Sequence, residues 1–280
     1  MAEKSKKESA SLRFLYHTAL GRLLLKPLVA PCVSRLVGAF MSSSLSRPLI
    51  PRFVKKNGIC LSDYEDAHYR SFNDCFTRKI KPEMRPIPKD AGLFIAPCDA
   101  YLSAYPIEEN SVFHIKGSDY TVSGLLGGNE ALANAYAGGT ALVFRLCVHH
   151  YHRYIYLDDG TKGENVFLKG KLHTVRPIAL ETFPVFVQNA REYTVMETAH
   201  FGAVTQIEVG ALLVGKIQNH HGVHAFVRGE EKGTFLYGGS TIVLLLEKDK
   251  VHLDERFFTA TEANTETEVR MGDVLGKRPE

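Results

Sequence analysis

The chain has 280 residues, a formal net charge of +3, and ordinary shares of hydrophobic (45%) and charged (23%) residues. This composition predicts one large globular domain, or one domain with a smaller element, and its near balance of charge gives no reason to expect a nucleic-acid partner. The five cysteines show no paired spacing, which predicts reduced thiols and no disulfide framework.

The N-terminal part of the chain is basic and lacks acidic residues. No Asp or Glu occurs in residues 9–62, which carry Arg13, Arg22, Lys26, Arg35, Arg47, Arg52, Lys55 and Lys56. Its apolar runs are too short for the roughly 20 residues of a membrane span. The segment suits the surface of an anionic bilayer, or else it forms a helical hairpin packed on the body of the protein.

Helical segments are predicted over residues 11–57, with breaks at the prolines of that stretch, Pro27, Pro31, Pro48 and Pro51. Apolar residues recur there at helical spacing: Leu12, Leu15, Tyr16, Leu20, Leu23 and Leu24. One further helix is predicted over residues 61–80, with Ser62 as N-cap and Glu65 completing a capping box. The proline-rich run at residues 82–88 marks a boundary between a helical region (1–81) and a second region (82–280).

The second region has the pattern of a β-rich domain. Short runs of β-branched and aromatic residues alternate with Gly, Asn and Asp turns. Strands are predicted over residues 93–96, 101–105, 141–157, 166–175, 193–199, 203–209, 211–217, 224–227, 234–237, 241–247 and 268–271. One helix is predicted over 123–137. The predicted fold class is therefore α+β, with an N-terminal helical, membrane-associating region and a mostly antiparallel β catalytic core.

The sequence Gly238-Gly239-Ser240-Thr241 lies between two apolar runs. A Gly-Gly hairpin turn would explain it without any chemistry, because glycine tolerates positive φ. The same residues also suit self-cleavage. The Ser240 hydroxyl can attack the unshielded carbonyl of Gly239 if a base removes its proton and polar donors hold the oxyanion.

Several segments, taken in order, resemble the phosphatidylserine decarboxylase family, especially its shorter bacterial type, over almost the whole chain. They are FTRKIKPEMRPI (76–87), APCDA (96–100), IKGSDYTVSGLL (115–126), RLCVHHYHRYIYLDDG (145–160), HTVRPIALE (173–181), EVGALLVGKI (208–217) and YGGSTIVLLLEKDKV (237–251). The resemblance implies autocatalytic cleavage at Gly239–Ser240, which converts Ser240 into a pyruvoyl group and leaves a heterodimer of the two fragments.

The resemblance also implies a Ser-His-Asp triad for the cleavage. Ser240 matches the cleaved serine, Asp99 the family aspartate, and His152 a histidine between Tyr and Arg. A second family histidine, three residues further on, is replaced here by Ile155, so His152 is the expected base and His150 its substitute. A strand over 141–157 would place His150 and His152 on one face and His149 on the other.

The pyruvoyl carbonyl is expected to form a Schiff base with phosphatidylserine and to act as the electron sink for loss of carbon dioxide, which gives phosphatidylethanolamine. Arg153, His150 and His221 are candidate substrate-binding residues. The histidines of residues 220–224 fit no standard zinc spacing, so no metal is expected. The protein is expected at the cytoplasmic face of the membrane, as a peripheral enzyme.

Two alternatives remain open. One is a pyruvoyl-dependent decarboxylase of a soluble amino acid, although such a substrate needs no membrane-binding segment. The other is a non-enzymatic barrel-sandwich binding module, because residues 208–215 and 270–276 resemble turns of biotinyl and lipoyl carrier domains. An intact Gly239–Ser240 bond in the purified protein would favour the module.

Overall fold

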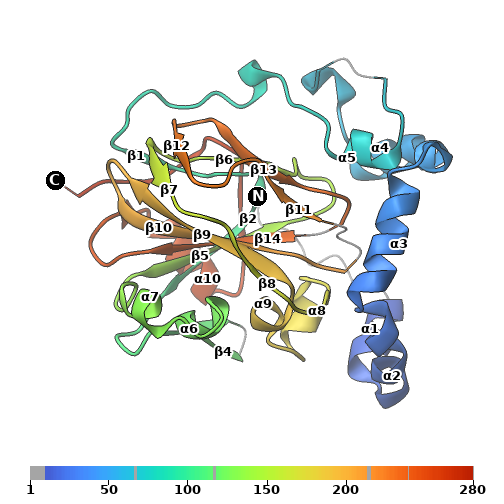
Figure 1. The fold of residues 1–280 in the computed structure, drawn as a ribbon, viewed down its shortest axis with the longest axis horizontal. Coiled ribbons are helices and arrows are strands. Elements are labelled where there is room, and N and C mark those ends of the chain that lie inside the picture. The colour runs from blue at the N-terminus through green and yellow to red at the C-terminus, as the bar shows by residue number, and fades with distance from the viewer. Residues whose placement is uncertain (1–9, 66–67, 116–117, 213–215, 239, 280) are drawn as a thin grey trace.

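The computed structural model describes residues 10–65, 68–115, 118–212, 216–238 and 240–279. The fold is α+β, as predicted: helices form the N-terminal part, and antiparallel sheets form the rest (Figure 1). Gly239, the first half of the predicted cleavage site, lies outside the described residues.

The N-terminal helices run along one side of the β body (Figure 1). They are α1 (Ala10–His17), α2 (Ala19–Leu28), α3 (Pro31–Met41), the 3-10 helix η1 (Ser44–Leu49) and α4 (Ile50–Asn57). Pro31 starts α3 as predicted, whereas Pro27 lies inside α2 and does not end it. The helices dock through Tyr16, which is fully buried and accepts a hydrogen bond from the Thr174 backbone N–H at 3.1 Å.

The outward faces of these helices carry apolar side chains. Leu20, Leu23 and Leu36 are 60%, 59% and 73% exposed. In the described part of the chain, no single helix is long and apolar enough to cross a membrane. The bent pair α2 and α3, which meet at 61°, passes that test of length and composition only when the two are taken together.

A nine-stranded antiparallel sheet forms the centre of the β body. Its strand order is β12 (His224–Phe226), β7 (Gly160–Lys162), β9 (Arg191–Thr198), β10 (Gly202–Val209), β14 (Ser240–Leu246), β5 (Thr140–Leu146), β2 (Ala100–Pro106) and β16 (Thr267–Val269), with β8 (Val166–Leu168) also paired to β9. All seven residues of β14 are buried. This strand therefore lies in the core, between β10 and β5.

Smaller elements surround this sheet. They are β11 (Ile217–Asn219), β13 (Glu231–Phe235) and β6 (Arg153–Ile155) in one sheet; β1 (Leu93–Ile95), β17 (Val274–Lys277) and β15 (His252–Leu253) in another; the pair β3 (Val112–Ile115) and β4 (Ser118–Thr121); and the helices α8 (Pro177–Leu180), α9 (Val185–Gln188) and α10 (Arg256–Glu262). A buried ion pair between Lys232 of β13 and Glu208 of β10, at 2.7 Å, joins the β11-β13-β6 sheet to the large one.

Two predicted helices are wrong. Residues 61–80 contain the 3-10 helix η2 (Leu61–Asp63) and the short α5 (Phe72–Phe76), which Ser71 caps, and the 3-10 helix η3 (Pro82–Met84) follows. Tyr64 and Ile80 form an antiparallel bridge, so the chain folds back on itself and cannot be one helix. The helix predicted over 123–137 is split into α6 (Val122–Leu125) and α7 (Glu130–Asn134) by Gly127 and Gly128, whose φ angles of 70° and 92° do not fit an α-helix.

The strand predicted over 141–157 is also wrong, because it is two strands with a turn between them. β5 pairs with strands of the large sheet, whereas β6 pairs with β13 of a smaller one. The chain must therefore leave one sheet for the other, and it does so through residues 147–152. His150 and His152 lie on this turn and not on a strand face.

The strand predicted over 166–175 is shortened to β8, and part of the strand predicted over 211–217 lies outside the described residues. The Gly-Gly segment does not form the hairpin turn that would explain it structurally. β13 ends at Phe235 and β14 begins at Ser240, but each strand pairs with other partners. The segment between them is a crossing from one sheet to another.

Candidate active site

Ser240 is the first residue of the buried strand β14 and is itself fully buried. Its register partner on β5 is Leu146, so the serine lies beside the end of β5 where the turn 147–152 begins. Gly238, two residues earlier, has a φ of 129°, which side chains other than hydrogen disfavour. The backbone at Gly238 therefore has a conformation that favours glycine.

His152 is the side chain that meets Ser240. Its Nδ1 lies 3.4 Å from the Ser240 Oγ, and its Nε2 lies 3.0 Å from the carbonyl oxygen of Cys147. A carbonyl oxygen only accepts, so Nε2 carries the proton and donates it to Cys147. The Nδ1 lone pair then faces the serine hydroxyl, which is the tautomer that a base needs.

Burial keeps this imidazole neutral. Burial, together with the nearby Arg78 guanidinium, lowers the pKa of His152 to about 3. The Phe76 ring of α5 packs on the imidazole with 4.2 Å between ring centroids. The histidine is therefore an uncharged proton acceptor in a site closed to water.

His150 has the opposite hydrogen-bonding arrangement at its Nδ1. That atom accepts a 3.0 Å hydrogen bond from the backbone N–H of Cys147, so the proton of the neutral ring is on Nε2. This Nε2 is buried and has no hydrogen-bond partner among the described residues. Burial lowers the pKa of His150 to about 2. His150 is thus suited to donate a hydrogen bond and not to remove a proton.

Asp99 is placed differently from the predicted triad. It forms a bidentate pair with Arg85, with Nε to Oδ1 at 2.8 Å, and it accepts a hydrogen bond from the Met271 backbone N–H at 2.9 Å. The atom that orients His152 is the Cys147 carbonyl oxygen. The structure therefore brings Ser240 and His152 together, while Asp99 binds Arg85.

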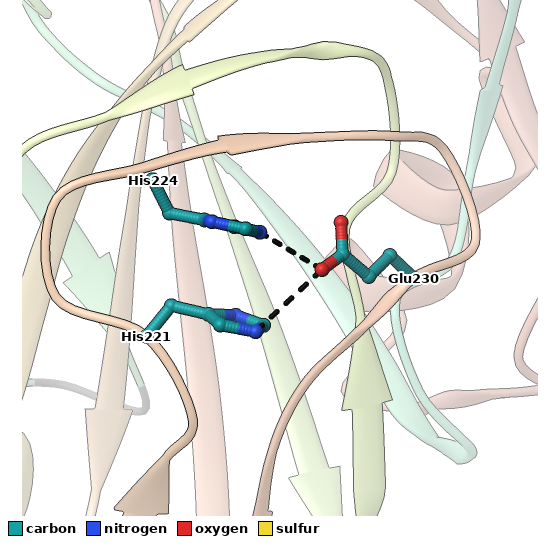
Figure 2. A group of neighbouring side chains, drawn as sticks. All are labelled: His221, His224 and Glu230. Carbon is teal, nitrogen blue, oxygen red and sulfur yellow. Dashed lines mark hydrogen bonds and ion pairs between the residues drawn. The ribbon is translucent and has the colours of Figure 1, made fainter.

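Arg153 and His221, the other two candidate substrate-binding residues, contact other side chains. Arg153 binds Glu231 at 2.6 Å and donates to the carbonyl oxygen of Thr77 at 2.9 Å. His221 lies in a cluster with His224 and Glu230 (Figure 2). Neither arrangement tests the predicted role in substrate binding.

Sequence reasoning missed three residues of this site, Cys147, Phe76 and Arg78. Cys147 acts through its backbone, so its side-chain type carries no signal. Phe76 had a signal, because it opens the first of the segments that resemble the family. Contacts of Phe76 with His152 and of Thr77 with Arg153 cross the predicted boundary at residue 82. The helical part therefore contributes directly to the site.

Comparison with known proteins agrees with this site. A family model described as phosphatidylserine decarboxylase matches residues 72–277. The chain belongs to the phosphatidylserine decarboxylase family. The resemblance inferred from the segments quoted above is confirmed, and the matched region begins at the first residue of α5, the helix that covers His152.

Individual relatives in the family match over nearly the full chain. Phosphatidylserine decarboxylase proenzyme 2 of Clostridium acetobutylicum is 43% identical over 271 residues, which cover 96% of this chain and 92% of that protein. The phosphatidylserine decarboxylase proenzymes of Ruminiclostridium cellulolyticum and Clostridium botulinum strain 657 are 39% and 37% identical. Each alignment covers 95% of this chain, and 90% and 92% of those proteins respectively.

Because His152 is buried in its neutral form, we expect the folded protein to lose stability at low pH. The unfolded imidazole takes up a proton below a pKa of about 6.5, whereas the folded one does so only near 3. The unfolded state therefore binds more protons across that window, and stability is lost as the pH falls from about 6.5 towards 3. In a Ser240→Ala background, His152→Gln should flatten the slope of unfolding free energy against pH by about 1.4 kcal/mol per pH unit. Urea unfolding between pH 7 and 4.5 measures it, and equal slopes would contradict a neutral buried His152.

Proposed function

We propose that this protein converts phosphatidylserine to phosphatidylethanolamine and carbon dioxide, using a pyruvoyl group made from Ser240 by self-cleavage. The observation that carries the proposal is the buried pair of Ser240 Oγ and His152 Nδ1 at 3.4 Å, with the imidazole held in the accepting tautomer by Cys147. The printed names of the relatives, which are decarboxylase proenzymes, support the same conclusion. A binding module needs no such pair.

In the proposed cleavage, His152 Nδ1 takes the hydroxyl proton while Ser240 Oγ attacks the Gly239 carbonyl carbon. The Gly239–Ser240 amide becomes an ester, and the amine of Ser240 is freed. Loss of the Ser240 Cα proton then expels the Gly239 carboxylate and leaves dehydroalanine, which takes up water and releases ammonia. General-base assistance of this kind contributes roughly 10²–10⁴-fold in rate.

The surrounding residues fit the group that results. A pyruvoyl group supplies an electrophilic carbonyl and an electron sink for decarboxylation. His152 lies within reach of residue 240 and can return the proton it holds, and the His150 Nε2–H has no partner of its own. Burial of all of β14 shields this end of the strand from bulk solvent.

The site also contains an uncompensated positive charge. Arg78 is 2% exposed, and its N–H groups donate to backbone carbonyls and to Tyr64 Oη, while its Nε has no hydrogen-bond partner in the described structure. No carboxylate among the described residues forms an ion pair with it. Burying a cation without a counter-charge is costly, so an anionic substrate would supply the missing charge. We propose that Arg78 favours the carboxylate of the serine headgroup.

The base assignment can be tested by the extent of cleavage. His152→Gln should leave the chain uncut, as Ser240→Ala should, because the serine is then unactivated. Asp99→Asn should slow cleavage far less, since Asp99 binds Arg85 and not His152. Intact mass over time would show whether the fragments 1–239 and 240–280 form.

Two outcomes of that experiment would contradict the proposal. Normal cleavage in His152→Gln, with none in His150→Gln, would transfer the base role to His150. A wild-type chain that is active while uncut would remove the pyruvoyl group from the mechanism altogether.

The role of Arg78 predicts a change in substrate affinity. Arg78→Gln should cleave itself but raise KM for detergent-dispersed phosphatidylserine by about 10- to 100-fold, because a hydrogen bond to a charged group contributes about 1.5–3 kcal/mol. Arg78→Lys should recover part of the loss. Arg228→Gln is the matched control, since Arg228 also donates to backbone carbonyl oxygens, those of Leu157 and Leu93, and is not a candidate substrate-binding residue. An equal rise of KM in both glutamine variants would show a general structural effect.

We further propose that the N-terminal helices bind the surface of an anionic membrane, at which the enzyme is peripheral. All eight basic residues of 9–62 are exposed, and Leu20, Leu23 and Leu24 are 60%, 59% and 49% exposed. A hairpin packed on the body would bury these leucines. Exposed leucines beside basic side chains are instead typical of a helix at the headgroup boundary. A soluble amino-acid substrate would not need this surface.

Charge reversal tests the membrane surface. Arg13→Glu, Arg22→Glu and Lys26→Glu together should weaken binding to phosphatidylserine vesicles strongly, because each basic residue contributes on the order of 1 kcal/mol. Activity on vesicles should fall, whereas self-cleavage and activity on detergent-dispersed substrate should persist. High salt should loosen the wild type only partly, since leucine burial does not depend on salt. Co-sedimentation with vesicles measures binding.

The control variant carries three reversals of the same charge on exposed residues of the β body, Lys89→Glu, Lys250→Glu and Arg270→Glu. It should bind vesicles like the wild type. Equal binding by both triple variants and the wild type would contradict the proposed membrane surface. Leu23→Ser with Leu24→Ser should weaken binding without lowering the melting temperature, because both side chains are already exposed.

A further inference from the structure

The chain between β11 and β13 brings two histidines and a glutamate together, apart from the contacts made by Ser240 and His152. His224 Nε2 lies 2.8 Å and His221 Nε2 lies 3.5 Å from the same oxygen, Glu230 Oε1 (Figure 2). One ligand atom of each residue lies within 4.8 Å of the other two. The side chains are 27–30% exposed, so the cluster can be reached from solvent.

Neighbouring groups hold two of the three side chains in this orientation. The Tyr156 hydroxyl lies 3.2 Å from His221 Nδ1, and the Val227 backbone N–H donates to Glu230 Oε2 at 3.1 Å. Partners of this kind fix the orientation of the His221 ring and of the Glu230 carboxylate, as they do around metal ligands. Gly229, with a φ of 85°, makes the turn that returns Glu230 towards the histidines.

The distances to Glu230 suit a transition metal once the histidine rings turn. The His221 and His224 rings are stacked, with 3.9 Å between their centroids and 14° between their planes, so one imidazole must rotate before both Nε2 atoms can bind one ion. Bonds of 2.0–2.2 Å at tetrahedral angles place neighbouring ligand atoms about 3.3–3.5 Å apart. The His221–Glu230 distance already lies in that range, and the His224–Glu230 distance must open by about half an ångström. Two imidazoles and one carboxylate form a donor set that zinc accepts, with water as the fourth ligand.

We propose that His221, His224 and Glu230 form a binding site for a divalent transition metal of the zinc type. Calcium and magnesium are excluded by the donor set, because these ions prefer oxygen ligands. The bound ion would cross-link the chain between β11 and β13 at three points. It would therefore stabilise the segment that leads into β13 and on towards Ser240.

The local charges permit a cation at this point. Lys162 is the nearby positive group, but its ammonium donates to the carbonyl oxygens of His221 and Gly222 and to Asn165 Oδ1. The Glu164 carboxylate lies beside Gly222. Glu164 and Glu230 together offset Lys162 and leave one negative charge for the ion. Since Lys162 occupies the two carbonyls, the ligands are limited to the three side chains and water.

The test uses the full-length protein and Zn²⁺ alone. Calorimetric titration of metal-stripped wild type should show one Zn²⁺ per chain and a higher melting temperature with Zn²⁺ but not with Mg²⁺. Glu230→Gln and His224→Asn should abolish both effects. His220→Asn is the matched control on the same loop, because His220 binds Glu231 and is not part of the cluster. It should bind Zn²⁺ like the wild type.

Two further measurements test the metal site even if Glu230→Gln or His224→Asn folds poorly. Tyr156→Phe should weaken Zn²⁺ binding by about 10- to 100-fold, because partners of metal ligands contribute that much to affinity. Co²⁺ added to the wild type should give the visible absorption of a four- or five-coordinate ion. No saturable Zn²⁺ binding by the wild type, or equal binding by wild type and Glu230→Gln, would overturn the site.

Discussion

The exclusion of water from one imidazole is the constraint on which the proposed chemistry depends. A histidine in water near neutral pH is partly protonated and cannot always accept a proton. His152 escapes this because it is fully buried, with Phe76 on its face and the Arg78 guanidinium near enough to oppose a second positive charge. The N-terminal part of the chain supplies both residues. The helical part therefore contributes side chains to the candidate active site, in addition to the proposed membrane surface.

One residue of the turn between β5 and β6 organises both histidines. The Cys147 carbonyl oxygen accepts from His152 and the Cys147 N–H donates to His150, so the backbone of a single residue sets both protonation patterns. The two rings then have different capacities, one to accept a proton and the other to donate a hydrogen bond. Such a division suits a reaction in which a proton is removed from one atom while negative charge develops on another. Under the proposed mechanism, the Cys147 carbonyl oxygen would take the orienting role that an aspartate has in a triad.

The sequence was sufficient for the α+β class and for most of the central strands, because alternating apolar runs are local signals, and the glycine pair was enough to single out Ser240 as a candidate. It was insufficient for the turn at 147–152, since an apolar run before it and an aromatic run after it look continuous until their pairing partners are known. Cys147 could not be found, because a backbone group acts whatever its side chain. The contact of Glu230 with the histidines was missed for a related reason: these side chains become neighbours only through the turn at Gly229. The helices predicted over 61–80 and 123–137 are wrong for two different reasons. A β-bridge folds back the first segment, and positive φ angles at two glycines interrupt the second, although both sequences favour a helix locally.

The position of β14 between β10 and β5 determines the order in which folding and the proposed cleavage can occur. Ser240 meets His152 only after this strand has been inserted, so under the proposed mechanism a misfolded chain would not cut itself and would not acquire a reactive carbonyl. The proposed cut then severs the connection between β13 and β14 while the hydrogen bonds on both sides of β14 keep the fragment in place. Denaturation after the proposed cut would separate the fragments 1–239 and 240–280, which folded as a single chain. Their reassembly would then depend on protein concentration. Under the proposed mechanism, a cut Gly239–Ser240 bond would therefore mark a chain that has folded correctly around β14.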